Sequence, residues 1–404
     1  MNRTAQILSL VFAVLCVANC NAEDWYRWRG PNLSGVSSEV SWLDRWPEDG
    51  PRIAWRGSVG TGYSSFAISD GRALTMGNAD ETDTVFCLDA TTGKGVWSHS
   101  YGSPLDDRFF AGGPTSTPTV DGSRVYSLGR QGDLFCFDAV TGKVSWSKNI
   151  AEEAEVRVTG WGFASAPLVH KNLLLLNVGE AGTAVDKMTG EIVWTSADRD
   201  SGYSSFTPFQ KGDRWCAAFG SSKHYMAIDI DTGKELWRKR WLTRFGVNAS
   251  EPIVVDDHVF ISSGYNRGSA LLKMGDAELE FVWESKELQN QMNSSVLIDG
   301  HLYGIDGDTT SETFLKCVEF MTGEVKWSQD GIGSGALMAA DGKLIILSEQ
   351  GELIIAKASQ QGFEPTARHD VMDGKCWTVP VLSNGLIYCR NEVGDVVCVD
   401  VRKE

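Results

Sequence analysis

Short apolar runs separated by turn-forming residues recur along most of the chain. The runs at 125–128, 173–176, 259–262 and 344–347 are each four residues long and rich in strand-forming residues. Gly, Asp and Asn interrupt the pattern at short intervals, and no segment shows a long apolar period of 3.6 residues bounded by helix caps. The pattern therefore predicts an all-β protein with almost no helix.

Tight turns divide these runs into eight units. Each turn lies between two strand-like runs, as the turn of a β-hairpin does. After its hairpin, each unit continues through a third strand to a Thr-Gly turn and a fourth strand that ends at Trp. Four antiparallel strands per unit predict the blade of a β-propeller. The eight turns are at 70–71, 121–122, 171–172, 211–212, 256–257, 299–300, 341–342 and 384–385.

An eleven-residue motif repeats independently of the turns. The copy at 227–237 reads AIDIDTGKELW, and related copies occupy 87–97, 136–146, 184–194 and 317–327. A degraded copy ends at Trp283, and Trp55 keeps the same phase, so Trp recurs every 42 to 49 residues. Periods of this length are typical of propellers and solenoids. The predicted repeat anchors are Trp55, Trp97, Trp146, Trp194, Trp237, Trp283 and Trp327, with Gly93, Gly142, Gly190, Gly233 and Gly323 in the Thr-Gly turns.

The ends of the repeat pattern predict a closed ring. Residues 398–400 begin a motif copy that has no Trp, whereas 52–55 carry a Trp with no preceding motif. The N-terminal segment should therefore supply the outer strand of the last blade, which removes a free sheet edge. We expect one eight-bladed propeller domain at 51–404, with 23–50 as an N-terminal strap outside the ring.

The first 22 residues have the pattern of a secretory signal peptide. Arg3 precedes an apolar run at 7–18, and small residues precede Glu23. We expect an exported protein, periplasmic or extracellular, that is a monomer. A second interpretation takes Cys20 as a lipid-attachment site, which would add a membrane anchor.

The net charge limits the possible partners, and the positions of the cysteines indicate whether they form disulfides. The formal net charge of −16 argues against nucleic acid as a partner, because phosphates require clustered Lys and Arg. Seven of the nine cysteines lie beyond residue 22. Four of them open copies of the repeat motif, where a small apolar residue is needed, so we expect them to be unpaired packing residues. These four are Cys87, Cys136, Cys317 and Cys398.

The repeated motif resembles the pyrroloquinoline-quinone (PQQ)-like repeat with its tryptophan-docking pattern Ala-x-Asp-x-x-Thr-Gly-Lys-x-x-Trp. The resemblance covers nearly all of the mature chain, although 356–366 has neither Thr-Gly nor Trp. It implies an eight-bladed propeller similar to non-enzymatic outer-membrane assembly factors of the BamB type. The function this implies is a protein- or peptide-binding scaffold in the cell envelope.

The same repeat also occurs in quinoprotein alcohol dehydrogenases, which bind PQQ and Ca²⁺. Those enzymes are much longer and usually carry a disulfide between adjacent cysteines, whereas the closest pair here is Cys389 and Cys398. The six His residues have no metal-ligand spacing. We expect no cofactor, no metal and no catalytic residue; the alternative is a PQQ-dependent dehydrogenase or other small-molecule enzyme at the channel mouth.

The longer connections should gather on one face of the ring. The first and third connections of each blade are tight turns, whereas the long segments 101–114, 150–163 and 286–294 belong to the opposite face. Binding residues commonly lie on loops held by a rigid scaffold, and Arg, Trp and Tyr are frequent anchors. The related segments 62–66 and 202–206 should border the central channel. The predicted binding face comprises Arg108, Arg130, Trp161, Tyr265, Arg267, Asn293, Lys375 and Trp377.

Overall fold

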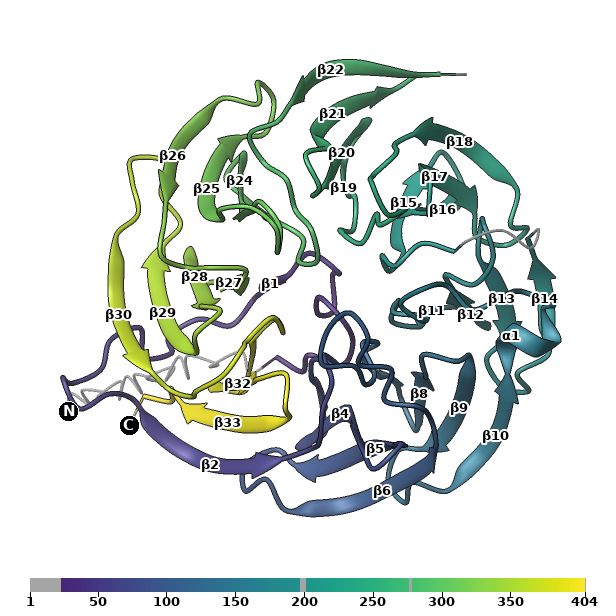
Figure 1. Cartoon of the computed structure of the whole chain (residues 1–404), viewed down its shortest axis with the longest axis horizontal. Coiled ribbons are helices and arrows are strands. Elements are labelled where there is room, and N and C mark those ends of the chain that lie inside the picture. The colour runs from purple at the N-terminus through teal and green to yellow at the C-terminus, as the bar shows by residue number, and fades with distance from the viewer. Residues whose placement is uncertain (1–22, 197–200, 276–277, 404) are drawn as a thin grey trace, which may run out of the picture.

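The computed structural model describes residues 23–196, 201–275 and 278–403, which form a ring of eight β-sheets around a central channel (Figure 1). In seven of the sheets four strands are paired in antiparallel order, and the eighth has a fifth strand. The described residues contain one helix, α1, at Ile150–Glu153. The predicted all-β, eight-bladed propeller with almost no helix is thus confirmed.

The strands run outwards from the channel in chain order within each blade. The first four blades comprise β3 (Ala67–Ser69), β4 (Arg72–Ala79), β5 (Thr82–Asp89) and β6 (Gly95–Gly102); β7 (Thr119–Asp121), β8 (Arg124–Leu128), β9 (Asp133–Asp138) and β10 (Val144–Asn149); β11 (Leu168–His170), β12 (Leu173–Leu176), β13 (Thr183–Asp186) and β14 (Ile192–Thr195); and β15 (Thr207–Lys211), β16 (Arg214–Gly220), β17 (His224–Asp229) and β18 (Glu235–Arg240).

Blades five to eight complete the ring. They comprise β19 (Ile253–Val255), β20 (His258–Ser263), β21 (Gly268–Met274) and β22 (Leu279–Ser285); β23 (Val296–Ile298), β24 (His301–Asp306), β25 (Phe314–Glu319) and β26 (Val325–Gln329); β27 (Ala336–Ala340), β28 (Lys343–Leu347), β29 (Glu352–Lys357) and β30 (Pro365–Asp370); and β31 (Val381–Ser383), β32 (Leu386–Arg390) and β33 (Asp395–Asp400), with β2 (Arg52–Ser58) as the outer strand.

The last blade joins the two ends of the ring, as the incomplete motif predicted. Strand β2 pairs antiparallel with β33, and Trp55 lies opposite Cys398. Buried Arg390 then ties this blade to the first one, because its guanidinium donates to the carbonyls of Ser64 (2.8 Å), Met76 (2.7 Å) and Gly60 (3.0 Å). No free sheet edge remains where the chain ends meet.

Five of the repeat Trp residues lie against the Thr-Gly turn of the next blade: Trp55, Trp97, Trp146, Trp194 and Trp283. The indole N–H of Trp97 donates to the carbonyl of Ala139 (3.1 Å), and Trp55, Trp146, Trp194, Trp283 and Trp327 make the equivalent bond. Gly142 has a φ of +70°, and a Cβ placed there would come within 2.5 Å of the Trp97 ring. The turn therefore needs Gly both for its left-handed backbone and for space beside the indole. Trp237 is also buried, against the fifth blade, whose motif is degraded.

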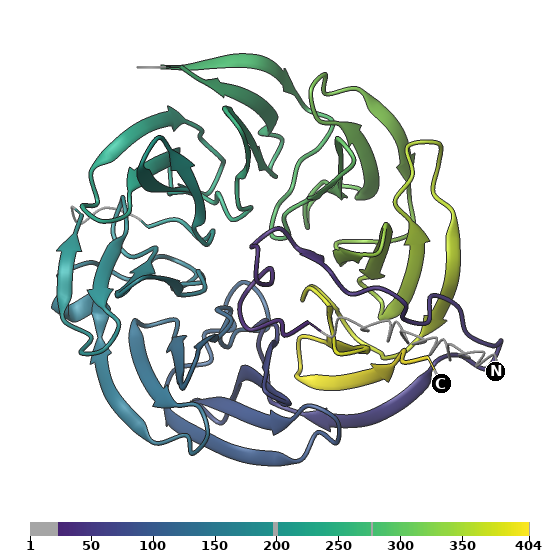
Figure 2. The ribbon, with the colours of Figure 1, turned by 180° about the vertical axis from the view of Figure 1, so that it is seen from behind.

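The N-terminal strap does not lie outside the ring, so that expectation is wrong. It crosses one end of the channel, as the view from behind shows (Figure 2), and β1 (Val36–Ser37) adds a parallel fifth strand to the seventh blade beside β27. The amides of Ile68 and Val120 donate to strap carbonyls, at 2.9 and 2.8 Å. Inner strands otherwise leave unpaired backbone groups at the channel, and the strap satisfies several of them. The predicted signal peptide, 1–22, and Cys20 lie outside the described residues.

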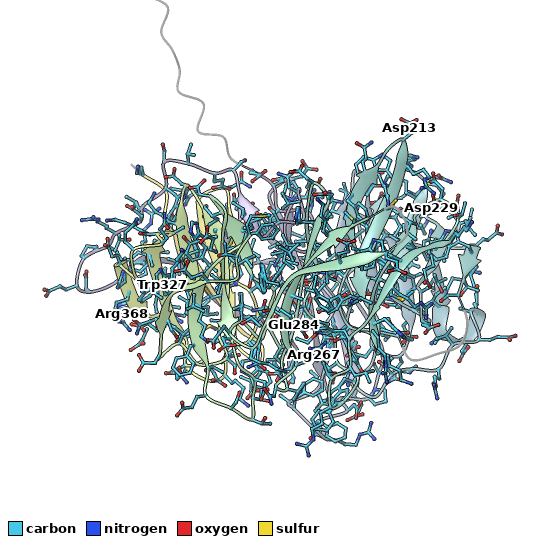
Figure 3. The ribbon with its side chains drawn as sticks, turned by 90° about the horizontal axis from the view of Figure 1, so that it is seen from above. Asp213, Asp229, Arg267, Glu284, Trp327 and Arg368 are labelled. Carbon is cyan, nitrogen blue, oxygen red and sulfur yellow. The ribbon has the colours of Figure 1, made fainter. Side chains whose placement is uncertain are left out.

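The two faces of the ring differ as predicted. The tight turns, such as those at Asp213 and Asp229, lie on one face, which also carries the strap; we call it the turn face (Figure 3). The longer links between blades, including 103–118 and 150–167, lie on the other, which we call the link face. No helix among the described residues is long and apolar enough to cross a membrane.

Candidate functional site

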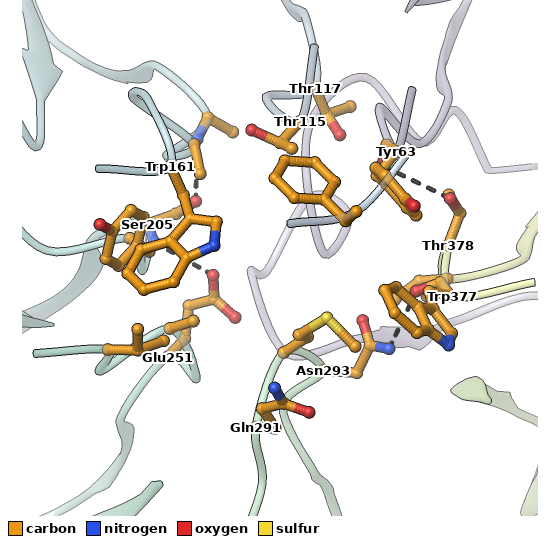
Figure 4. A pocket seen from close by; sticks show the side chains of 18 of the residues that line it. Tyr63, Thr115, Thr117, Trp161, Ser205, Glu251, Gln291, Asn293, Trp377 and Thr378 are labelled. Atoms are coloured by element: carbon orange, nitrogen blue, oxygen red, sulfur yellow. Dashed lines mark hydrogen bonds between the residues drawn. The ribbon is translucent and has the colours of Figure 1, made fainter. Parts of the chain in front are cut away.

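A cavity of about 240 Å³ occupies the channel on the link-face side (Figure 4). Its walls come mainly from the link that precedes each inner strand, and one strap residue, Trp28, also lines it. Phe109 at the mouth is 68% exposed, so the cavity reaches the surface there. Since the strap crosses the opposite end, the channel forms a pocket rather than a through-passage.

A short sequence repeat in these links builds the walls. A buried hydroxyl residue precedes every inner strand by two or three positions: Ser64, Ser116, Ser165, Ser204, Ser250, Ser294, Ser334 and Thr378. Several of these hydroxyls accept a hydrogen bond from the blade's second strand, as Ser64 does from the Met76 amide (3.2 Å) and Ser204 from the Gly220 amide (2.7 Å). Side chains alternate along extended backbone, so the residues on either side of the hydroxyl point into the channel.

The repeat thus places two tiers of side chains around the cavity. The residue before each hydroxyl forms the mouth tier, with Tyr63, Thr115, Ala164, Tyr203, Ala249, Asn293 and Trp377 lining the cavity. The residue after it forms the deep tier, with Thr117, Ala166, Ser205, Glu251 and Val379. Inner strands run from the link face to the turn face, which makes the second tier the deeper one. Glu251 is the one charged member of either tier.

Aromatic rings form an arc around the mouth. The ring of Tyr63 stacks on Trp377 (5.7 Å between centroids) and tilts against Phe110 (5.5 Å). On the other side, Trp161 contacts Phe109 at 5.6 Å and Tyr203 at 5.9 Å. Such tilted and edge-to-face pairs stabilise aromatic clusters. The arc continues through Phe245 to Tyr265, whose ring centroids are 5.1 Å apart.

Hydrogen bonds hold the polar edges of these rings. The Tyr63 hydroxyl donates to Glu392 (2.9 Å), and burial, together with this carboxylate, raises the pKa of Tyr63 well above its usual value. The Gln291 amide donates to the Tyr265 hydroxyl (2.7 Å), and the Trp377 indole N–H donates to Glu349 (3.0 Å). The polar edges of these rings are therefore held by protein groups before any ligand arrives.

Glu251 forms the floor of the cavity together with Trp28. Its Oε1 accepts from the Trp28 indole N–H (2.9 Å) and the Ser205 amide (3.1 Å), and its Oε2 accepts from the Ser294 hydroxyl (2.5 Å). Arg29, next to Trp28 in the strap, is fully buried; burial lowers its pKa, and the charge of Glu251 opposes that effect. The strap thus contributes both a wall and an electrostatic partner to the site.

The structure brings half of the predicted binding residues to the cavity. Trp161, Tyr265, Asn293 and Trp377 line it. The Asn293 amide also donates to the carbonyls of Gly335 (3.3 Å) and Trp377 (3.0 Å), which joins the links before the sixth, seventh and eighth blades.

The four predicted cations are absent from the cavity lining. Arg130 is 1% exposed and supports the site from behind, because its guanidinium donates to the Trp161 carbonyl (3.0 Å) and pairs with Asp106 (3.0 Å). Exposed Arg108 pairs with Asp106 (2.6 Å). Arg267 pairs with Glu284 (2.9 Å, Figure 3) and lies 3.3 Å above the Trp241 ring; Lys375 lies 4.5 Å above Trp377.

Sequence reasoning missed Glu251 and Trp28. Glu251 could have been found by aligning the Ser-x pair before each inner strand, because the corresponding residues of other blades are small or apolar, such as Thr117, Ala166 and Val379. Trp28 carries no such signal, since its position depends on how the strap crosses the ring. Tyr63 and Tyr203 lie in the two related segments that were expected beside the channel, and both line the cavity.

The donor set does not fit PQQ. The quinone carries three carboxylates, which need cationic partners when buried. The residues lining the cavity include one carboxylate and no Lys, Arg, His or Cys. Within the described part of the chain, no group of three or more His, Cys, Asp or Glu residues is arranged to hold a metal ion. All seven cysteines of this part are buried and unpaired.

Fold and site together define an aromatic pocket with one carboxylate, at one end of an eight-bladed propeller. The sequence model of the family described as outer membrane protein assembly factor BamB matches residues 81–329, more than half of the chain, and the chain belongs to this family. It is a PQQ-like propeller of the BamB-like type.

Solved structures of related propellers show the same fold. The chain is similar to BamB from Moraxella catarrhalis, with a TM-score of 0.64 and 17% identity, covering 87% of this chain and 99% of that one. It is also similar to a europium-containing methanol dehydrogenase (TM-score 0.69, 12% identity, 92% and 90% coverage). A third similar structure is the quinohemoprotein alcohol dehydrogenase from Comamonas testosteroni (TM-score 0.69, 14% identity, 96% and 82% coverage). No curated protein matches the sequence.

Proposed function

We propose that this protein is an exported, non-catalytic binding module of the cell envelope that docks an extended polypeptide segment on its link face. The observation that carries the proposal is the aromatic pocket, closed by the strap at one end and open between the links at the other. Peptide segments bind where a rigid scaffold offers a pocket for one side chain and loops for its neighbours. Membership of the BamB family favours a role in outer-membrane protein assembly, with a protein as partner.

The chemistry of the lining favours binding over catalysis. General acid–base or nucleophilic catalysis needs a base within hydrogen-bond reach of the reacting group. The single carboxylate in the cavity, Glu251, already accepts three hydrogen bonds from Trp28, Ser205 and Ser294. These three hydrogen bonds hold the Glu251 carboxylate in one position in the cavity wall. We therefore propose no cofactor, no metal and no catalytic residue.

A pull-down from envelope extracts of the native bacterium tests the docking face. The double variant Trp161→Ala/Trp377→Ala removes two rings of the mouth, and we expect it to lose capture of the partner. Trp215→Ala is the matched control, because Trp215 is 36% exposed and lies in β16, outside the residues that line the cavity. Equal capture by wild type and the double variant would refute the proposal.

An activity assay tests the enzymatic alternative independently. We expect protein incubated with PQQ and Ca²⁺ to give no alcohol-dependent reduction of an artificial electron acceptor above the rate of free PQQ. Turnover that disappears in Trp161→Ala/Trp377→Ala but persists in Trp215→Ala would establish a quinoprotein function instead.

A further inference from the structure

We propose that the cavity recognises an organic ammonium group, such as the end of a lysine side chain, between its aromatic walls and the carboxylate of Glu251. This inference rests on the proposed function, because it names the chemical group that a docked segment would insert.

The walls offer aromatic faces at several angles around one small space. Tyr63, Trp161 and Tyr265 come from three different blades or links and all line the cavity. Tyr63 is tilted by 53° against Phe110 and stacks on Trp377 at 25°, and Trp161 lies edge-to-face on Tyr203 at 80°. Cations bind over ring faces, and cages of several rings are the usual receptors for substituted ammonium ions.

Cations of the chain itself already use rings at this mouth. Arg130 lies 5.0 Å from the Phe110 centroid, Lys375 lies 4.5 Å from that of Trp377, and Arg244 lies 5.1 Å from that of Phe245. Over the described residues, no such cation lies on Tyr63, Trp161 or Tyr265. Among the described residues, these three rings of the lining can therefore receive a ligand cation.

The charge inside the cavity favours a cation over an anion. Glu251 is the charged residue of the lining, and its three hydrogen-bond donors are neutral groups. In the part of the chain that the structure describes, no Lys or Arg nitrogen lies within 4 Å of its carboxylate. Arg29 acts on Glu251 from the strap, yet its guanidinium donates to the carbonyls of Ser34 (2.8 Å) and Ser295 (2.9 Å).

Three of the cations predicted for the binding face are paired with carboxylates, which weakens their repulsion of such a ligand. Arg130 pairs with Asp106, Arg267 with Glu284, and Lys375 with Glu392, at 3.0, 2.9 and 3.6 Å. The cavity volume of about 240 Å³ is below the range of about 300–1,000 Å³ typical of sites for drug-sized ligands. It therefore suits one side-chain-sized group.

Calorimetric titration with a charged ligand and its neutral isostere tests the inference directly. Choline and 3,3-dimethylbutan-1-ol have nearly the same shape and differ in the positive charge. We expect choline to bind about tenfold more tightly than the alcohol. A second pair, Nα-acetyl-lysine amide and its Nε-acetylated form, makes the same charged-against-neutral comparison for a primary ammonium group. Comparing the two pairs shows whether the cavity prefers a primary or a quaternary ammonium.

Variants assign the binding to this cavity. Glu251→Gln keeps the shape and an acceptor for Trp28, so it should weaken choline several-fold while leaving the neutral alcohol unchanged. Trp161→Leu should abolish choline binding and Trp161→Phe should restore part of it, which gives a second test if Glu251→Gln fails to fold. Trp215→Leu should have no effect.

The outcomes separate this inference from the proposed function. Equal affinity for choline and its isostere, or no binding of either charged ligand by wild type, would overturn the ammonium site. If capture of a polypeptide partner still depended on Trp161 and Trp377, the docking function would stand with a neutral inserted side chain. Choline binding that survives Trp161→Leu and Glu251→Gln would place it elsewhere and would also overturn the inference.

Discussion

The contact between Trp97 and Gly142 allows a quantitative test of how neighbouring blades hold together. Gly142 has a φ of +70°, and the Cβ of an alanine there would lie 2.5 Å from the Trp97 ring. The left-handed backbone should cost Gly142→Ala about 1–2 kcal/mol. Crowding of the ring should cost a further 1–3 kcal/mol or so, because the packed indole must shift. We expect a loss of roughly 2–5 kcal/mol in the free energy of unfolding.

A second glycine in the same backbone conformation supplies the control. Gly71 has a φ of +71°, and its added Cβ would meet nothing within 4 Å. Gly71→Ala should therefore lose only the backbone contribution, about 1–2 kcal/mol. Urea unfolding monitored by tryptophan fluorescence gives the free energy of unfolding of both variants. The comparison requires that its dependence on urea concentration has the same slope in both.

A double-mutant cycle assigns the difference to the indole. In a Trp97→Leu background, Gly142→Ala should cost no more than Gly71→Ala, because the crowded ring is absent. Equal unfolding midpoints for Gly142→Ala and Gly71→Ala in the wild-type background would refute the packing argument. So would a cost of Gly142→Ala that stays unchanged in the Trp97→Leu background.

Two further predictions concern buried thiols and the closing blade. Burial raises the pKa of Cys87 to about 11 and that of Cys376 to about 12, so we expect thiol reagents at pH 8 to modify the protein without residues 1–22 only after denaturation; rapid reaction of the native protein would contradict this. Hydrogen bonds from Arg402 lower the pKa of Asp400, which also pairs with Arg52 across the last blade. A depressed carboxyl pKa stabilises the fold above the unfolded value near 3.9, and this stabilisation is lost as the pH falls below it. Asp400→Asn should therefore lower the Tm at pH 7 but flatten its fall between pH 5 and 3; a parallel fall in both proteins would refute the assignment.

The fold could be predicted from the sequence because each blade repeats the same local chemistry. The Thr-Gly turn and the Trp that follows it define the outer strands, and the eight hairpin turns supply the count even where the motif is lost at 356–366. Closure of the ring could be predicted because Trp55 has no preceding motif, whereas the motif that begins at 398–400 has no Trp. In the structure Trp55 lies opposite Cys398. The strap was misplaced, because its pairing with β27 is non-local and Val36–Ser37 is too short to be read as a strand.

The site could be predicted only in part, for a different physical reason. Large aromatic residues on long links, such as Trp161 and Trp377, stand out in composition and do line the cavity. Charged residues on the same links were expected there too, but Arg130 is buried as a support for the Trp161 carbonyl. A cation on a link can serve either role, and the choice depends on whether an acid such as Asp106 folds beside it.

The asymmetry of this pocket arises where individual blades depart from the common pattern. The buried hydroxyl before each inner strand is shared by all eight blades and fixes the backbone that lines the channel. On that constant frame, the flanking side chains differ from blade to blade and line the cavity. Glu251 is the departure that matters most: the strap brings Trp28 to its carboxylate, while the other deep-tier positions that line the cavity stay neutral. The pocket is thus asymmetric within a ring of repeated blades, through its aromatic mouth tier, one acidic residue of the deep tier and one indole from the strap.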